Sequence, residues 1–148
     1  MPATLTRTQE PAHAPQRTAE RRLAARSTRI LLVEDEPLTA EVFARALSRD
    51  GHVVEVAIDG LQALRRLRDR LPSLVVLDMS LPALSGADVV RRLRADGHDK
   101  LPIIVVSGSA RRSADLGDEE LWPGTWIEKP VKPRDLVRIV RAFTGEQC

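Results

Sequence analysis

Short apolar runs alternate with amphipathic segments from about residue 29 onward. Continuous apolar runs at 30–33, 74–77 and 103–106, with weaker ones at 53–57 and 125–127, predict five short strands. Between these runs apolar residues recur every three or four positions, which predicts helices that cover the sheet. Strands that alternate with helices are typical of a parallel sheet, so the pattern predicts a doubly wound α/β domain.

Proline, glycine and aspartate mark the ends of the predicted helices. Pro37 lies near the start of the first helix and Gly51 ends it, Asp59 caps the second, and Pro133 opens the last. The apolar residues expected to face the sheet are Leu38, Val42, Phe43, Ala46 and Leu47 in the first helix, Leu61, Leu64, Leu67 and Leu71 in the second, and Leu136, Ile139, Val140 and Phe143 in the last. A third helix is expected over 87–96, and the irregular stretch 109–123 predicts a short or distorted one.

Residues 1–28 differ in composition from the rest of the chain. They carry five arginines and two glutamates, a net charge of +3, whereas the remainder carries −1. With three prolines and few large apolar residues, this segment cannot bury enough surface to fold alone. We therefore expect a disordered basic tail over 1–28, one domain over 29–144 and a short C-terminal tail over 145–148. The basic tail is either a solvated extension or a nonspecific contact for nucleic acid or anionic lipid.

The composition excludes several classes of protein. No apolar stretch approaches the roughly 20 residues of a membrane span, and the N-terminus lacks the apolar middle of a secretory signal. The only cysteine is Cys148, which excludes an internal disulfide and a metal cage built from cysteines. We expect a cytoplasmic protein with no membrane span.

Polar residues follow four of the predicted strands. Glu34 and Asp35 follow the first, Asp78 the third, Ser107 the fourth and Lys129 the fifth. Because parallel strands bring their carboxyl ends to one edge of a sheet, these side chains are expected to converge in one pocket. Carboxylates are ligands that Mg²⁺ prefers, and an aspartate can attack phosphorus to form an aspartyl phosphate. The sequence thus predicts a site that binds a metal and accepts a phosphoryl group.

Most of these residues also have a simpler structural explanation. Either Glu34 or Asp35 can cap the first helix. Ser107 can form hydrogen bonds with backbone groups of its loop. Lys129 is explicable as a surface lysine before a turn proline. Asp78 is harder to explain in this way, because an unpaired carboxylate there repels its acidic neighbours.

Four motifs in order, LLVEDEP, VVLDMSLP, VVSGSA and WIEKP, resemble those of a response-regulator receiver domain over residues 29–143. The resemblance implies a five-stranded parallel sheet of order 2-1-3-4-5 with helices on both faces. It implies Asp78 as the phosphoacceptor, and Lys129 and Ser107 as groups that bind the phosphoryl oxygens. The implied metal is Mg²⁺, with Mn²⁺ as an alternative, and its implied ligands are Glu34, Asp35, Asp78 and the backbone carbonyl of Ser80.

The resemblance also implies a phosphodonor and a conformational switch. The donor is a histidine kinase or a histidine phosphotransfer protein, and the receiver catalyses only its own phosphorylation and dephosphorylation. In the switch, Ser107 moves toward the phosphoryl group and the aromatic residue, here Trp126, turns inward. Tyrosine or phenylalanine is usual at that position, and a place in the core is the alternative reading for the larger tryptophan.

Nothing after Phe143 is long enough to form an output domain, so we expect a stand-alone receiver that signals by contact with an unknown downstream protein or as a homodimer. A phosphate sink or shuttle in a phosphorelay is the alternative. A small phosphatase is a second hypothesis, but such enzymes generally need a second acid where Ser80 stands. A third is binding to DNA through the basic tail, which without sequence-reading groups gives only salt-sensitive attraction.

Overall fold

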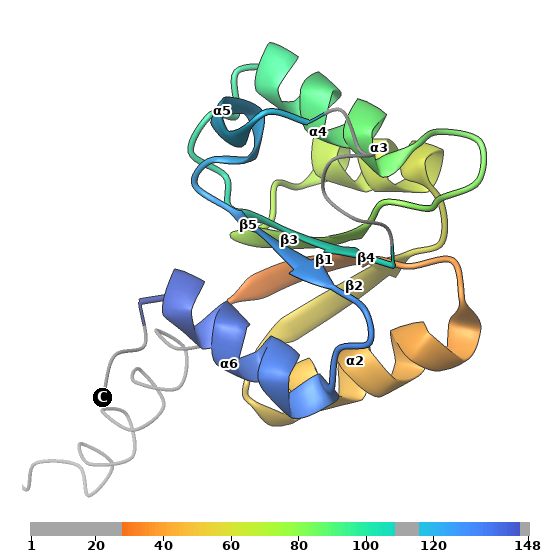
Figure 1. Cartoon of the computed structure of the whole chain (residues 1–148), viewed down its shortest axis with the longest axis vertical. Coiled ribbons are helices and arrows are strands. Elements are labelled where there is room, and N and C mark those ends of the chain that lie inside the picture. Colours follow the sequence, from red (N-terminus) through yellow and green to blue (C-terminus); the bar gives the residue numbers. More distant parts are fainter. Residues whose placement is uncertain (1–27, 109–115, 146–148) are drawn as a thin grey trace, which may run out of the picture.

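The computed structural model describes residues 28–108 and 116–145, and strands alternate with helices throughout them (Figure 1). The elements are β1 (Arg29–Val33), α2 (Pro37–Arg49), β2 (Val53–Ala57), α3 (Gly60–Asp69), β3 (Leu74–Asp78), α4 (Gly86–Ala95), β4 (Ile103–Ser107), α5 (Asp118–Leu121), β5 (Thr125–Glu128) and α6 (Pro133–Phe143). Each predicted strand is present, and its ends differ from the prediction by no more than one residue.

The strands form one parallel sheet in the order β2-β1-β3-β4-β5. Helices α3, α4 and α5 cover one face of this sheet, and α2 and α6 cover the other (Figure 1). The doubly wound fold and its expected strand order are therefore confirmed. The arrangement also places the carboxyl ends of β1, β3 and β4 side by side.

Two apolar cores fill the spaces between the sheet and its helix layers. Successive residues of a strand point to opposite faces, so Leu31 and Val33 pack under α3 and α4, whereas Ile30 and Leu32 pack against α2 and α6. Every residue of β3 and β4 is buried, as their continuous apolar runs require for central strands with both faces covered.

Side-chain caps begin three of the helices. The Asp59 carboxylate accepts a hydrogen bond from the Gln62 N–H at 2.7 Å, which confirms the predicted cap of α3. The Ser85 hydroxyl accepts from the Asp88 N–H at 3.2 Å, and the Glu36 carboxylate accepts from the Leu38 N–H at 3.4 Å. These caps fix where each chain segment leaves the carboxyl edge of the sheet.

Four apolar side chains that were expected to face the sheet are instead exposed, so that prediction was wrong for them. They are Leu38 (71% exposed), Val42 (49%), Leu61 (52%) and Leu71 (45%). A helix on a sheet buries only a narrow stripe, and the stripes here include small residues, with Ala40 in α2 and Gly60 and Ala63 in α3. Large residues alone therefore misplaced the buried side of α2 and α3, and Leu71 lies beyond the end of α3.

Other predictions concern segments that are short or lie outside the described residues. Helix α5 has only four residues, which confirms the short helix expected in this region. The basic tail lies outside the described residues apart from Thr28, and so does most of the C-terminal tail. Across 28–108 and 116–145, every helix is too short or too polar to cross a membrane.

Candidate functional site

Three adjacent strands carry polar residues to the carboxyl edge of the sheet. Glu34 and Asp35 directly follow β1, Asp78 is the last residue of β3 and Ser107 is the last of β4. Lys129 follows β5, and its backbone N–H donates a hydrogen bond of 2.8 Å to the Ser107 carbonyl. The parallel register thus brings residues from four strands to one edge, as the sequence predicted.

Three carboxylates form the centre of the site. Glu34, Asp35 and Asp78 each offer an oxygen, and these oxygens lie within 4.8 Å of one another. Glu34 and Asp78 are buried, whereas Asp35 is exposed. A hard divalent cation such as Mg²⁺ prefers a few carboxylate oxygens and keeps several of its waters, and a cluster that is open to solvent on one side suits it.

The Lys129 amine lies beside two of these carboxylates. Its Nζ is 3.1 Å from Asp78 Oδ2 and 3.9 Å from Glu34 Oε2. About a third of the lysine side chain remains exposed, so the ammonium group is reachable from solvent. This position next to Asp78 fits a group that pairs with phosphoryl oxygens.

Backbone amides hold the two buried carboxylates in place. The Ser80 N–H donates to Asp78 Oδ1 at 3.0 Å, and the Glu36 N–H donates to Glu34 Oε1 at 3.2 Å. Hydrogen bonds to an ionised carboxylate are stronger than those between neutral groups. They orient Asp78 from the loop that follows β3 and Glu34 from the start of α2.

The acidic cluster is electrostatically unbalanced. Burial, and next the charge of Asp78, raises the pKa of Glu34 from its ordinary value of 4.5 to about 7. The Glu36 N–H and the Lys129 charge act in the opposite direction but do not offset these effects. The single ammonium group of Lys129 therefore does not balance the negative charge of three carboxylates. This donor set fits a divalent cation, whose positive charge would complete the balance.

Ser107 and Trp126 occupy different surroundings near this edge. Ser107 is buried, with 1% of its surface exposed. Trp126 is partly buried and packs against the apolar core under α3 and α4, and its indole N–H is buried with no hydrogen-bond partner among the described residues. Packing in the core thus agrees with the alternative reading of Trp126, and the roles of both residues in a switch stay predictions.

Two glycines that the sequence analysis did not single out shape the loop after Asp78. A Cβ on Gly86 would lie 2.7 Å from the Asp78 carbonyl oxygen, and a Cβ on Gly60 would lie 2.5 Å from the Leu84 carbonyl oxygen. Only glycine permits such close approach of backbone to backbone. The signals available in the sequence were the Asp59-Gly60 and Ser85-Gly86 pairs, each a capping residue followed by glycine at the start of a helix.

Comparison with known families agrees with this geometry. The sequence model of the response regulator receiver domain matches residues 30–141. The chain therefore belongs to this family, whose members are phosphoacceptor signalling modules rather than enzymes that act on other molecules. This confirms the receiver resemblance, and the acidic cluster of Glu34, Asp35 and Asp78 is the kind of site that such a domain carries.

Similar proteins of known sequence are response regulators. The chain is 39% identical over 114 residues to the DNA-binding response regulator MtrA of Mycolicibacterium smegmatis, covering 77% of this chain and 49% of that protein. It is 35% identical over 117 residues to the response regulator MprA of Mycobacterium ulcerans, covering 79% of this chain and 50% of that protein. The chain thus spans about half the length of the curated relatives it matches.

Solved structures show the same architecture. A CheY-like receiver domain from Methylobacillus flagellatus superimposes with a TM-score of 0.66 at 31% identity, covering 79% of this chain and 98% of that one. A receiver from Methanospirillum hungatei JF-1 gives a TM-score of 0.74 at 24% identity over 81% of this chain and 95% of that one, which bears on the fold alone.

Proposed function

We propose that this chain is a phosphorylation-controlled binding module of the cytoplasm. Asp78 takes a phosphoryl group from a histidine kinase or a histidine phosphotransfer protein in a Mg²⁺-dependent reaction, and the phosphorylated form signals by contact with another protein. The observation that carries this proposal is the convergence of Glu34, Asp35, Asp78 and Lys129 at one edge of the sheet.

Glu34, Asp35 and Asp78 would hold the cation, together with the backbone carbonyl of Ser80. Mn²⁺ shares the oxygen preference of Mg²⁺ and would occupy the same ligands. When bound, the cation offsets the repulsion between the carboxylate and the incoming phosphoryl group.

The residues of the chain have separate parts in the transfer. A carboxylate oxygen of Asp78 forms a bond to phosphorus, the phosphorus–nitrogen bond of the phosphohistidine breaks, and its electron pair stays on the imidazole nitrogen. Lys129, 3.1 Å from Asp78 before the reaction, pairs with a phosphoryl oxygen. Ser107 donates a hydrogen bond to another phosphoryl oxygen, and its movement, with that of Trp126, carries the change to the surface.

Phosphorylation by a small donor tests the proposal directly. Intact-mass measurement after incubation with acetyl phosphate and Mg²⁺ should show one added phosphoryl group on the wild type and none on Asp78→Asn. Asp88→Asn, an exposed aspartate on α4, is the matched control and should gain the group normally. Unmodified wild-type protein, or modification that persists in Asp78→Asn, would contradict the proposal.

A switch and a phosphate sink differ in what happens after transfer. A sink or shuttle returns the phosphoryl group quickly to a phosphotransfer histidine, whereas a switch keeps it long enough to bind a partner or form a homodimer. Loss of the added mass over time, with and without a phosphotransfer protein, separates the two roles.

A further inference from the structure

A groove lies between the C-terminal halves of α3 and α4. Its volume is about 350 Å³, and its lining includes Leu64, Leu67, Leu71, Leu93, Arg68 and Arg92. Both helices start at the carboxyl edge of the parallel sheet and run back toward its amino edge. The groove therefore lies at the end of the molecule opposite Asp78 and is separate from the phosphoacceptor site.

Positive charge is concentrated on the two helices that form this groove. Helices α3 and α4 and the residues that follow them carry seven arginines and three aspartates, although residues 29–148 together carry −1. The arginines are Arg65, Arg66, Arg68, Arg70, Arg91, Arg92 and Arg94, and the aspartates are Asp69, Asp88 and Asp96. The face formed by these two helices is thus positive on a domain that is otherwise acidic.

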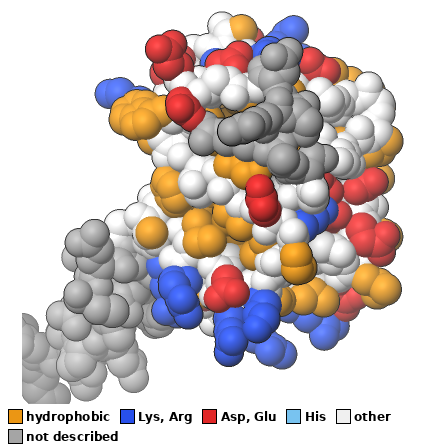
Figure 2. All heavy atoms as spheres, viewed as in Figure 1, with side chains coloured by type: hydrophobic (Ala, Val, Ile, Leu, Met, Phe, Trp, Pro, Cys, Tyr) orange, Lys and Arg blue, Asp and Glu red, His pale blue; other side chains and the backbone are white. Residues whose placement is uncertain are grey.

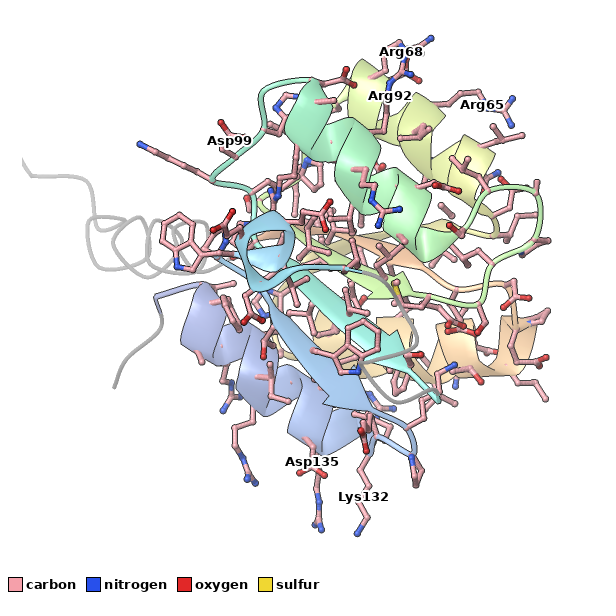
Figure 3. The ribbon with its side chains drawn as sticks, turned by 45° about the horizontal axis from the view of Figure 1, so that its top comes forward. Arg65, Arg68, Arg92, Asp99, Lys132 and Asp135 are labelled. Atoms are coloured by element: carbon pink, nitrogen blue, oxygen red, sulfur yellow. The ribbon has the colours of Figure 1, made fainter. Side chains whose placement is uncertain are left out.

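Several of these arginines lack an acidic partner. Within the described part of the chain, no ion pair or hydrogen bond involves the side chain of Arg65, Arg68 or Arg70, whereas Arg91 pairs with Glu120 at 3.2 Å. Arg92 has only an exposed contact of 3.6 Å with Asp96. Figure 3 shows Arg65, Arg68 and Arg92 projecting from one side of the molecule, opposite Lys132 and Asp135.

Exposed apolar surface accompanies this charge. Leu71, 45% exposed, follows α3 and lines the groove, and the partly exposed Leu64 on α3 lines it as well. Leucines that flank unpaired arginines fit a partner that is both apolar and acidic.

Other occupants fit the groove less well. A second copy that met this face with its own would bring like charges together, and the basic segment 1–28, with its net charge of +3, would be repelled. Nucleic acid would pair with the arginines, but its phosphates leave the leucines of the groove uncovered.

We propose that this groove binds an acidic amphipathic helix of a partner protein. Apolar side chains at helical spacing enter the groove beside Leu67, Leu71 and Leu93, and flanking carboxylates pair with Arg68 and Arg92. The surface is a docking site that does not depend on the phosphoacceptor chemistry, because it lies at the other end of the sheet.

The test uses the full chain and a fluorescent helical peptide with leucines along one side and glutamates beside them. Fluorescence anisotropy should show binding that weakens at least tenfold in the double variant Arg68→Glu, Arg92→Glu. The matched control is Arg134→Glu, Arg138→Glu on α6, where basic side chains gather on the opposite face (Figure 2). This control and Asp78→Asn should bind the peptide like the wild type.

Three results would overturn the proposal. They are no binding to the wild type, an equal loss in the α6 control, and tighter binding of a duplex DNA probe that is lost in the same groove variant. Thermal unfolding checks that each variant is folded. If the charge reversal unfolds the protein, Arg68→Gln, Arg92→Gln replaces it and should weaken peptide binding by at least threefold, and unchanged binding would equally overturn the proposal.

Discussion

Among single residues, Glu34 lowers the stability of the metal-free fold but adds a carboxylate to the site. Its side chain is buried next to Asp78, and its pKa rises to about 7 because burial disfavours the charged form. A residue chosen for stability alone would not place a second carboxylate here. The resulting loss of stability is consistent with a site in which a bound cation balances the negative charge.

Glu34→Gln should stabilise the metal-free protein above pH 7. Because the folded pKa of Glu34 is raised from 4.5 to about 7, the folded protein holds a proton that the unfolded chain has lost between these values. The free energy of unfolding therefore falls as pH rises through this window and stays low above it. Urea unfolding with a chelator should show the variant more stable by about 1–2 kcal/mol at pH 8, with little difference at pH 4.

Mg²⁺ provides the complementary measurement on the same variant. The cation should raise the free energy of unfolding of the wild type and raise that of Glu34→Gln much less, because a ligand oxygen has lost its charge. If the free energy of unfolding has the same pH dependence in the wild type and in Glu34→Gln without metal, Glu34 is not the titrating group.

At the scale of elements, the C-terminal end of α2 is tied to α6 by a charged contact. The Arg141 guanidinium donates hydrogen bonds from Nε to both Asp50 oxygens, at 2.9 and 3.2 Å. Buried His52 adds a contact of 3.3 Å between its Nε2 and Asp50. These contacts join helices that are distant in sequence but neighbours under the same face of the sheet.

Asp50→Asn should destabilise the fold at neutral pH only. The hydrogen bond from Arg141 lowers the pKa of Asp50, so its stabilising effect is present above the ordinary carboxyl value and is lost as pH falls through the lowered pKa in the folded state. Chemical unfolding at pH 7 should show a loss of about 1 kcal/mol, with the difference disappearing in acid. Asp96→Asn, which breaks only the exposed pair with Arg92, is the control and should change stability little.

At the scale of the whole molecule, charge is distributed unevenly between the N-terminal segment and the domain. Residues 1–28 carry +3 and the rest −1. Attraction between basic side chains and DNA phosphates is electrostatic and does not depend on sequence, so we expect the basic segment to bind DNA nonspecifically.

Replacing the five arginines of residues 1–28 with glutamine should remove binding to duplex DNA. An electrophoretic shift assay should show that the unmodified chain binds weakly, without sequence preference, and less tightly as salt increases, because the contacts release counterions. A shift that depends on DNA sequence, or one that survives the substitutions, would contradict this origin.

Most of the fold, and the convergence of polar residues at one edge of the sheet, were predictable from the sequence. Alternating apolar runs and helical periods are local patterns, and a parallel sheet must bring its strand ends to one edge. The order of the strands came from the resemblance to receivers, since the periodicity of each segment does not say which neighbour it pairs with. The rule about strand ends predicts that Asp78 and Lys129 lie close together, and their side chains are 3.1 Å apart.

How deeply each residue is covered depends on how the helices pack on the sheet. Leu61 and Leu71 are exposed although the periodicity predicts that they face the sheet. Glu34 is buried enough to raise its pKa, and the packing of α3 and α4 forms the arginine-lined groove between them. Burial depends on neighbours that are distant along the chain, so the local pattern that determines an element does not determine its surroundings. The local pattern therefore predicts which groups meet at the carboxyl edge, whereas contacts between distant parts of the chain set the burial and the charge around each group.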